Sequence, residues 1–261
     1  MPFANNNGVK IYYEVEGQGP PLVLAHGRWR DLSDWRKSGY TDALRNDFSL
    51  ILFDVRGHGK SDKPHKTSDY GSNMANDVTA VLDDLGIGKA SFFGYSLGAA
   101  IGWWSAIRFN NRFSSLILGG LSPYGLSDAQ IKQWVGSIEG LRKRLVDPEA
   151  AMKGREQSLG RHLTPEERNE FLSADIEAQI ALSASAPEWT FNDRDLAGVS
   201  QPCLLYCGDR DPFHTGAKEG ANHIPQARFV SLPGLEHGPV FFRSDLVLPH
   251  VKEFLAEVSK M

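Results

Sequence analysis

The stretch Phe93-Gly94-Tyr95-Ser96-Leu97-Gly98 places a Gly-x-Ser-x-Gly pattern between two elements of different type. The apolar run 90–93 before it predicts a strand, and the small-residue run 97–108 after it predicts a helix. A serine at such a turn adopts a strained backbone conformation, and its side chain projects clear of the sheet. The N–H of Leu97 then lies at a helix N-terminus, where it is free to donate to an anion. The pattern therefore predicts an exposed Ser96 hydroxyl beside an anion-binding donor.

Composition and charge narrow the class of protein. The chain of 261 residues is 41% hydrophobic and 23% charged, which is typical of a globular protein with a substantial core. Its net charge of −4 gives no basic excess, so we expect neither nucleic acid nor a membrane as a partner. The polar segment 1–7 has no targeting pattern, and no apolar run approaches the roughly 20 residues that span a bilayer. We therefore expect a cytoplasmic protein.

The two cysteines, Cys203 and Cys207, fall in one apolar run that predicts a strand. Four residues along a strand cover about 13 Å. A disulfide requires Cα atoms within about 7 Å of each other. We therefore expect two buried free thiols that pack as small apolar side chains.

Short apolar runs alternate with helical patterns over most of the chain. The runs that predict strands are 9–15, 21–25, 49–53, 90–93, 115–119, 203–207 and 228–232. The patterns that predict helices are 33–46, 74–85, 97–108 and 247–258. Alternation of this kind predicts a parallel sheet with helices on both faces.

The alternation stops between residues 122 and 195. Capping boxes at 127–130 and 164–167 begin helical patterns. The first pattern keeps one apolar face, which consists of Ile131, Trp134, Val135, Ile138 and Leu141. The segment has no strand pattern, so we expect two to four helices that form a cap (lid) at 122–195. The core then consists of 1–121 and 196–261.

A serine hydroxyl becomes a strong nucleophile only beside a general base, and the base needs an acid to orient it. His237 follows the last predicted strand, and Asp211 follows the strand before it. The chain order Ser96, Asp211, His237 is that of one class of enzyme. Asp209 is the alternative acid, although a turn at the end of the strand also explains it. The residues therefore predict a catalytic triad of Ser96, His237 and Asp211.

Five motifs resemble those of the α/β-hydrolase fold family, over almost the whole chain outside the cap. They are His26-Gly27, 54–61 (Asp-Val-Arg-Gly-His-Gly-Lys-Ser), 94–98 (Gly-Tyr-Ser-Leu-Gly), 208–211 (Gly-Asp-Arg-Asp) and 236–238 (Glu-His-Gly). The resemblance implies a mostly parallel eight-stranded sheet with helices on both faces and a helical cap insertion. It also implies Asp211 as the acid. Some relatives carry an aspartate nucleophile, so Ser96 argues against haloalkane dehalogenase and epoxide hydrolase chemistry.

The residue after His26-Gly27 is expected to supply the second oxyanion donor. The two donors are then the backbone N–H groups of Arg28 and Leu97. A large basic side chain at this position departs from the small or apolar residue that the family leads us to expect. The Arg28 guanidinium either pairs with Asp31 or Asp34, which we favour, or faces the pocket and selects a polar or anionic substrate.

An apolar pocket is expected over the serine, because such a pocket suits an acyl chain or an aromatic acid. Its expected lining residues are Trp29, Tyr124, Trp134, Trp189, Phe191, Phe213, Val240 and Phe241. His214 follows the Asp211 turn and is a further candidate for the lining. No spaced set of histidines and carboxylates in the sequence resembles a metal site, so we expect neither a metal nor a cofactor.

The sequence thus predicts a serine hydrolase that cleaves carboxylic esters through an acyl-enzyme, with a small-molecule ester or lactone as its partner. A metal-independent lactonase, for example for N-acyl-homoserine lactones, shares the same machinery. Hydrolysis of C–C bonds and perhydrolase activity are further alternatives, since similar proteins have both. A small-molecule receptor of the same fold is the alternative from another class, and slow or single turnover would distinguish it. The sequence leaves the oligomeric state open.

Overall fold

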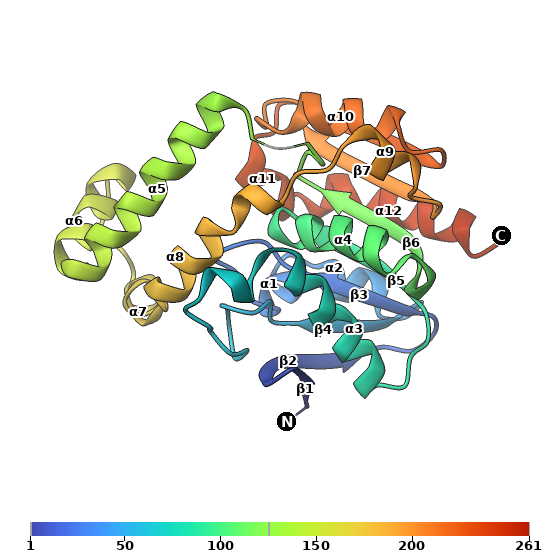
Figure 1. The fold of residues 1–261 in the computed structure, drawn as a ribbon, viewed down its shortest axis with the longest axis horizontal. Coiled ribbons are helices and arrows are strands. Elements are labelled where there is room, and N and C mark those ends of the chain that lie inside the picture. Colours follow the sequence, from blue (N-terminus) through green and yellow to red (C-terminus); the bar gives the residue numbers. More distant parts are fainter. Residues whose placement is uncertain (1, 125, 261) are drawn as a thin grey trace.

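Eight strands form one sheet: β1 (Phe3–Asn6), β2 (Val9–Glu16), β3 (Pro21–Ala25), β4 (Ser49–Phe53), β5 (Ala90–Tyr95), β6 (Phe113–Gly119), β7 (Cys203–Gly208) and β8 (Ala227–Leu232). Their order is β1-β2-β4-β3-β5-β6-β7-β8 (Figure 1). The β1–β2 and β2–β4 pairs are antiparallel, and the other neighbours are parallel. The computed structural model describes residues 2–124 and 126–260, so Met1, Gly125 and Met261 lie outside it. The sheet is the mostly parallel, eight-stranded one that the resemblance implied.

The first strand, β1, lies outside the runs that predict strands. It pairs with β2 through a turn at Asn7 and Gly8, whose φ angles are 50° and 92°. Two-residue hairpin turns with positive φ favour Asn-Gly, because glycine, and to a lesser degree asparagine, tolerates this conformation. The Asn7-Gly8 pair is therefore the sequence signal that identifies this hairpin.

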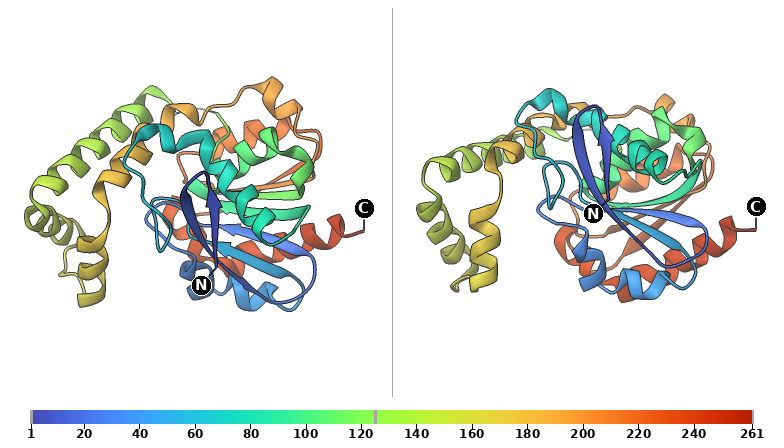
Figure 2. Two further views of the ribbon diagram at one scale, coloured as in Figure 1. Left: turned by 60° about the horizontal axis from the view of Figure 1, so that its bottom comes forward. Right: turned by 90° about the horizontal axis from the view of Figure 1, so that it is seen from below.

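Helices cover both faces of the sheet (Figure 2). One apolar cluster packs α3 (Met74–Asp84), α4 (Leu97–Arg108), α9 (Asp193–Ala197) and α10 (His214–Asn222) on one face. A second cluster packs α1 (Ser33–Lys37), α2 (Tyr40–Leu44), α11 (His237–Phe242) and α12 (Ser244–Val258) on the other. Removal of these two apolar faces from water is the main term that stabilises the fold.

The single helix predicted over 33–46 is wrong. Gly39 has a φ of 78° and separates α1 from α2. A residue in the left-handed region ends a helix, and glycine adopts that region at low cost. The break lets aromatic rings on both sides reach the core, because Trp35 and Tyr40 lie 4.9 Å and 5.6 Å from Phe93 between ring centroids.

Between β6 and β7 the chain leaves the sheet and forms the cap segment. It contains α5 (Asp128–Val146), α6 (Pro148–Leu159), α7 (Pro165–Ser173) and α8 (Ile176–Ala184), followed by a 3-10 turn at Ala186–Glu188. Helices α5 to α7 extend beyond the sheet, and α8 returns toward it (Figure 1). Capping boxes at Ser127 and Thr164 begin α5 and α7, as the sequence predicted. The predicted boundary at residue 195 falls inside α9, which belongs to the core cluster.

Two other predictions concern the cysteines and membranes. Cys203 and Cys207 are free and buried, as predicted. Burial raises the pKa of the Cys203 thiol to about 12, so this group stays protonated at neutral pH. Within residues 2–124 and 126–260, no helix has both the length and the apolar character needed to cross a bilayer.

Candidate active site

The turn at Ser96 joins β5 to α4, and its backbone conformation is one that residues other than glycine rarely adopt. Ser96 has a φ of 54°, and its N–H donates to the Gly119 carbonyl across the sheet, at 2.8 Å. A Cβ on Gly94 would lie 2.3 Å from the Gly98 carbonyl oxygen, and one on Gly98 would lie 2.0 Å from that of Ala25. Only glycine fits at either position. The local sequence thus fixes a tight turn that presents the serine.

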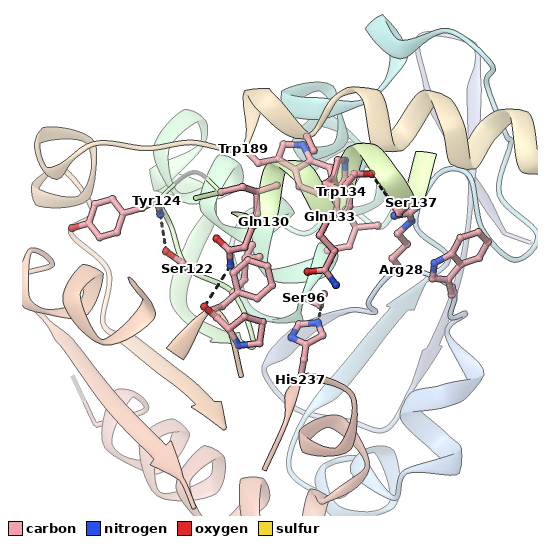
Figure 3. A pocket seen from close by; sticks show the side chains of 17 residues that line it. Arg28, Ser96, Ser122, Tyr124, Gln130, Gln133, Trp134, Ser137, Trp189 and His237 are labelled. Carbon is pink, nitrogen blue, oxygen red and sulfur yellow. Dashed lines mark hydrogen bonds between the residues drawn. The ribbon is translucent and has the colours of Figure 1, made fainter. Parts of the chain in front are cut away.

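Three side chains meet at the carboxyl edge of the sheet. The Ser96 Oγ lies 3.0 Å from His237 Nε2, and His237 Nδ1 lies 2.8 Å from Asp211 Oδ2. The Asp211 side chain is 0% exposed, whereas the His237 side chain is 33% exposed. The arrangement gives a hydrogen-bonded chain from an accessible hydroxyl, through an imidazole, to a buried carboxylate. Figure 3 shows the part of it between Ser96 and His237.

The two candidate acids occupy different positions. Asp211 Oδ1 accepts a hydrogen bond from the Phe213 N–H at 3.0 Å, which leaves Oδ2 for His237. Asp209 Oδ1 instead accepts from the Gly234 N–H at 2.8 Å. The structure therefore places Asp211 against the imidazole, and Asp209 ties two loops together.

The loop that carries His237 is held by contacts that the sequence did not reveal. The Tyr95 hydroxyl donates to the His237 carbonyl oxygen. The rings of Tyr95 and Phe213 each lie 5.6 Å from the imidazole, between centroids. Tyr95 is buried, as expected from its bulk, but its hydrogen bond joins positions 142 residues apart and has no local signal.

The two expected oxyanion donors lie on neighbouring strand ends. Arg28 follows β3, which pairs with β5 in the register Ala25–Gly94. A Cβ on Gly27 would lie 3.4 Å from the Ser96 Cβ, so this backbone passes directly beside the serine. Within the described residues, the N–H groups of Arg28 and Leu97 donate to no protein acceptor. Both remain free for a ligand oxygen.

The turn that carries Arg28 is held by a buried histidine. His26 Nδ1 lies 2.8 Å from the Gly27 carbonyl oxygen, and the Val55 N–H donates to His26 Nε2 at 3.0 Å. Burial lowers the pKa of His26, so the ring is neutral and serves as both donor and acceptor. Its role is structural.

A cavity of about 440 Å³ opens over Ser96 and His237. Of the expected lining residues, Trp29, Tyr124, Trp134, Trp189 and Phe213 contribute to it (Figure 3). Its other lining residues include Leu97, Leu121, Leu126, Gln130, Gln133, Ser137, Ala186 and Pro212. The volume suits a small organic molecule, and the wall is mainly apolar.

Three of the expected lining residues are wrong. Val240 and Phe241 are 0% exposed and lie on the inner side of α11, in the core beneath the site. Phe191 packs against Trp104 at 4.7 Å between ring centroids, in the cluster on the other face of the sheet. Each is adjacent in sequence to the site, but its side chain points into the core. His214 lines no part of the cavity either, because its Nε2 contacts Ser231 Oγ at 2.8 Å.

The face of α5 that lines the cavity differs from the predicted apolar face. Gln130, Gln133, Trp134 and Ser137 share it, and in Figure 3 the Gln133 side chain points toward Ser96 and His237. Ile131 and Val135 are instead exposed, at 47% and 59%. The spacing of three, four and seven residues groups these polar side chains on one side of a helix. The sequence analysis followed the apolar residues of this helix, and it therefore missed the polar residues that line the cavity.

The salt bridge predicted for Arg28 is wrong. Its Nε donates to Gln179 Oε1 at 3.2 Å and its Nη2 donates to Ser183 Oγ at 2.6 Å, and both partners belong to α8. The residues that pair with Asp34 are Arg30, at 3.2 Å, and Lys37, at 3.5 Å. Desolvation lowers the pKa of Arg28 to about 10, which leaves the guanidinium protonated at neutral pH.

The remaining histidines do not form a metal site. His58 is buried beside Gln179, and burial lowers its pKa to about 3. His65 contacts Asp175, and His162 contacts Glu156. In the part of the chain that the structure describes, no three histidine, cysteine or carboxylate side chains are grouped to hold a metal ion.

Comparisons with known proteins identify the family of this chain. Residues 20–244 match the family model described as "alpha/beta hydrolase fold". An AB hydrolase superfamily protein of Bacillus subtilis is 27% identical over 94% of this chain and 95% of its own. A 3-oxoadipate enol-lactonase of Acinetobacter baylyi is 28% identical over 80% of this chain and 79% of its own. The crystal structure of an enol-lactonase from Burkholderia xenovorans is similar with a TM-score of 0.78 and 25% identity, covering 98% and 100% of the two chains. The protein belongs to the alpha/beta hydrolase fold family.

Proposed function

We propose that this protein is a serine hydrolase that cleaves carboxylic esters through an acyl-enzyme. One observation carries the proposal: the Ser96 hydroxyl, the His237 imidazole and the buried Asp211 carboxylate form one hydrogen-bonded chain, with contacts of 3.0 Å and 2.8 Å. In such a chain the imidazole accepts the serine proton, and the carboxylate fixes its tautomer and stabilises the imidazolium.

The proposed reaction has two halves. Ser96 Oγ attacks the ester carbonyl while His237 takes its proton, and the Arg28 and Leu97 N–H groups stabilise the resulting oxyanion. His237 then gives the proton to the departing alcohol, which leaves an acyl group on Ser96. In the second half, His237 takes a proton from water, the water oxygen attacks the acyl carbon, and the carboxylic acid leaves as Ser96 regains its proton.

A lactone is the second candidate substrate. Two enol-lactonases are among the similar proteins, and a lactone is a cyclic ester that the same two half-reactions would open. The only chemical difference is that the alcohol stays attached to the product. Rates on matched open-chain esters and lactones decide between the two.

The test is the substitution Ser96→Ala. We expect p-nitrophenyl ester hydrolysis to fall by at least about 10⁴-fold, because removal of a triad nucleophile has effects of this size. The wild-type protein should complete many turnovers per molecule, whereas a receptor would stop after one or proceed slowly. Circular dichroism and thermal unfolding should show that the variant stays folded. Normal turnover by the variant would place the reaction elsewhere.

A further inference from the structure

The permanent charge of the cavity wall comes from one residue. Among the described residues that line it, Arg28 is the only arginine, lysine, aspartate or glutamate. The triad carboxylate lies behind His237 and is fully buried. A ligand in the cavity therefore meets one permanent positive charge and no exposed negative one.

Among the described residues, the Arg28 guanidinium has no counter-charge. Its two hydrogen-bond acceptors, the Gln179 amide oxygen and the Ser183 hydroxyl, are neutral. Within residues 2–124 and 126–260, no carboxylate forms an ion pair with it. A guanidinium has five N–H donors, so three of them lack a partner among these residues. A cation removed from water without an anion is unfavourable, and its desolvation is the cause of the lowered pKa.

Aromatic contacts hold the guanidinium in place without using its donors. Its Cζ lies 4.9 Å from the Trp29 ring centroid and 5.0 Å from that of Trp134. In Figure 3 the side chain extends from the edge of the sheet toward α5, beside Trp134. Trp29 has a φ of 64°, which is strained for a residue with a Cβ. The backbone therefore tolerates strain where the indole meets the arginine, as is common at functional sites.

The backbone and the side chain of Arg28 together indicate how a substrate would lie in the cavity. Its backbone N–H lies at the expected oxyanion position, and its guanidinium lies against Trp29 and Trp134, which line the same cavity as Arg28. A carboxylate matches the planar fork of a guanidinium with two parallel hydrogen bonds and neutralises its single charge. The apolar remainder of the wall suits the hydrocarbon part of an organic acid.

We propose that the Arg28 side chain binds a free carboxylate of the substrate, so that the protein prefers esters or lactones that carry a second, ionised acid group. This inference rests on the proposed ester hydrolysis and defines its substrate class. Arg28 is then a residue that determines specificity, with its side chain selecting the substrate and its backbone serving the reaction.

The experiment compares two ester series with the wild-type protein. One series is the monoethyl esters of glutaric, adipic and pimelic acid, and the other is ethyl esters of unbranched monocarboxylic acids of the same length. We expect kcat/KM to be about 10- to 100-fold higher for the acidic series, which is the effect of a hydrogen bond between charged groups. The preference should lie mainly in KM and should depend on chain length.

Three variants assign the preference to a side chain. Arg28→Met should reduce the ratio of the two kcat/KM values to near one, and Arg28→Lys should retain more of it because the charge remains. Arg144→Met is the matched control. Arg144 lies 5.7 Å from the Trp29 ring but does not line the cavity, so its loss should leave the ratio unchanged. An acidic preference in Arg28→Met as large as that of the wild-type protein would overturn the inference.

Two other outcomes separate this inference from the proposed function. If the wild-type protein hydrolyses neutral esters by means of Ser96 but shows no preference for acidic ones, the carboxylate site is wrong and the hydrolase stands. If it hydrolyses neither series, the proposed function itself fails. Should Arg28→Met not fold, inhibition of the wild-type protein provides the same test: hexanoate should inhibit at lower concentration than hexanamide, and equal inhibition would contradict the inference.

Discussion

The edge of the sheet and the cap differ in how much freedom they leave to a side chain. A Cβ added to Gly98, beside the serine, would lie 2.0 Å from the Ala25 carbonyl oxygen. One added to Gly136, on α5, would meet nothing within 4 Å. The Asp211 carboxylate at the sheet edge is fully buried, whereas Val135 on α5 is 59% exposed. Backbone packing thus fixes the positions of the reacting groups, whereas residues of the cap can change, and with them the shape of the pocket, without disturbing those groups.

Polar contacts join the cap to the core near the site. Gln130 Nε2 reaches the Pro212 carbonyl oxygen at 3.4 Å, and Gln179 Nε2 reaches that of Gly57 at 3.0 Å. Arg28 is the residue that belongs to both regions. Its backbone lies at the sheet edge, and its side chain is held by α8. Substitutions in each region should therefore affect different properties.

The largest expected effect comes from the acid at the sheet edge. Asp211→Asn should lower kcat by about 10⁴-fold, because the amide stabilises the wrong tautomer of His237 and cannot stabilise the imidazolium. Asp209→Asn is the matched control, since the Asp209 carboxylate accepts from the Gly234 N–H, whereas His237 contacts Asp211. Its kcat should be nearly that of the wild-type protein. A large loss in Asp209→Asn together with a small loss in Asp211→Asn would reverse the assignment of the acid.

The comparison of the two glycines predicts opposite effects on stability. Gly98→Ala should lower the free energy of unfolding by about 3 kcal/mol or more, because its Cβ meets the backbone of β3 and neither can move easily. Gly136→Ala should raise it by about 0.5 to 1 kcal/mol, because alanine favours a helix and the space is open. Urea unfolding of both variants measures the difference. Equal destabilisation would show that the cap is packed as tightly as the sheet edge.

Residues that act through local geometry could be predicted from the sequence. The spacing of Gly94, Ser96 and Gly98 determines the turn, and the resemblance identified Asp211 two positions after Asp209. The strands other than β1, and the helices α3, α4 and α12, followed from their apolar patterns, whereas α9, α10 and α11 were not predicted. β1 and the break at Gly39 depend on positive φ at a turn, which the apolar pattern does not report.

Residues that act through long-range packing could not be predicted in this way. The partners of Arg28 lie 151 and 155 residues away, so the nearby aspartates were the only acceptors that the sequence suggested. The orientation of α5 depends on how it packs against α8, and this packing exposes Ile131 and Val135. Val240 is close to His237 along the chain, yet the helix that begins at His237 turns its side chain into the core.

The central claim is that Ser96 carries the acyl group during the reaction. The most direct measurement is mass spectrometry of the wild-type protein quenched in acid within the first turnover of p-nitrophenyl acetate, followed by peptide mapping. The account predicts one added acetyl group on the peptide that contains Ser96, with p-nitrophenol released in an initial burst of one equivalent. Turnover with no adduct under these conditions, or an adduct that maps to another residue, would contradict it.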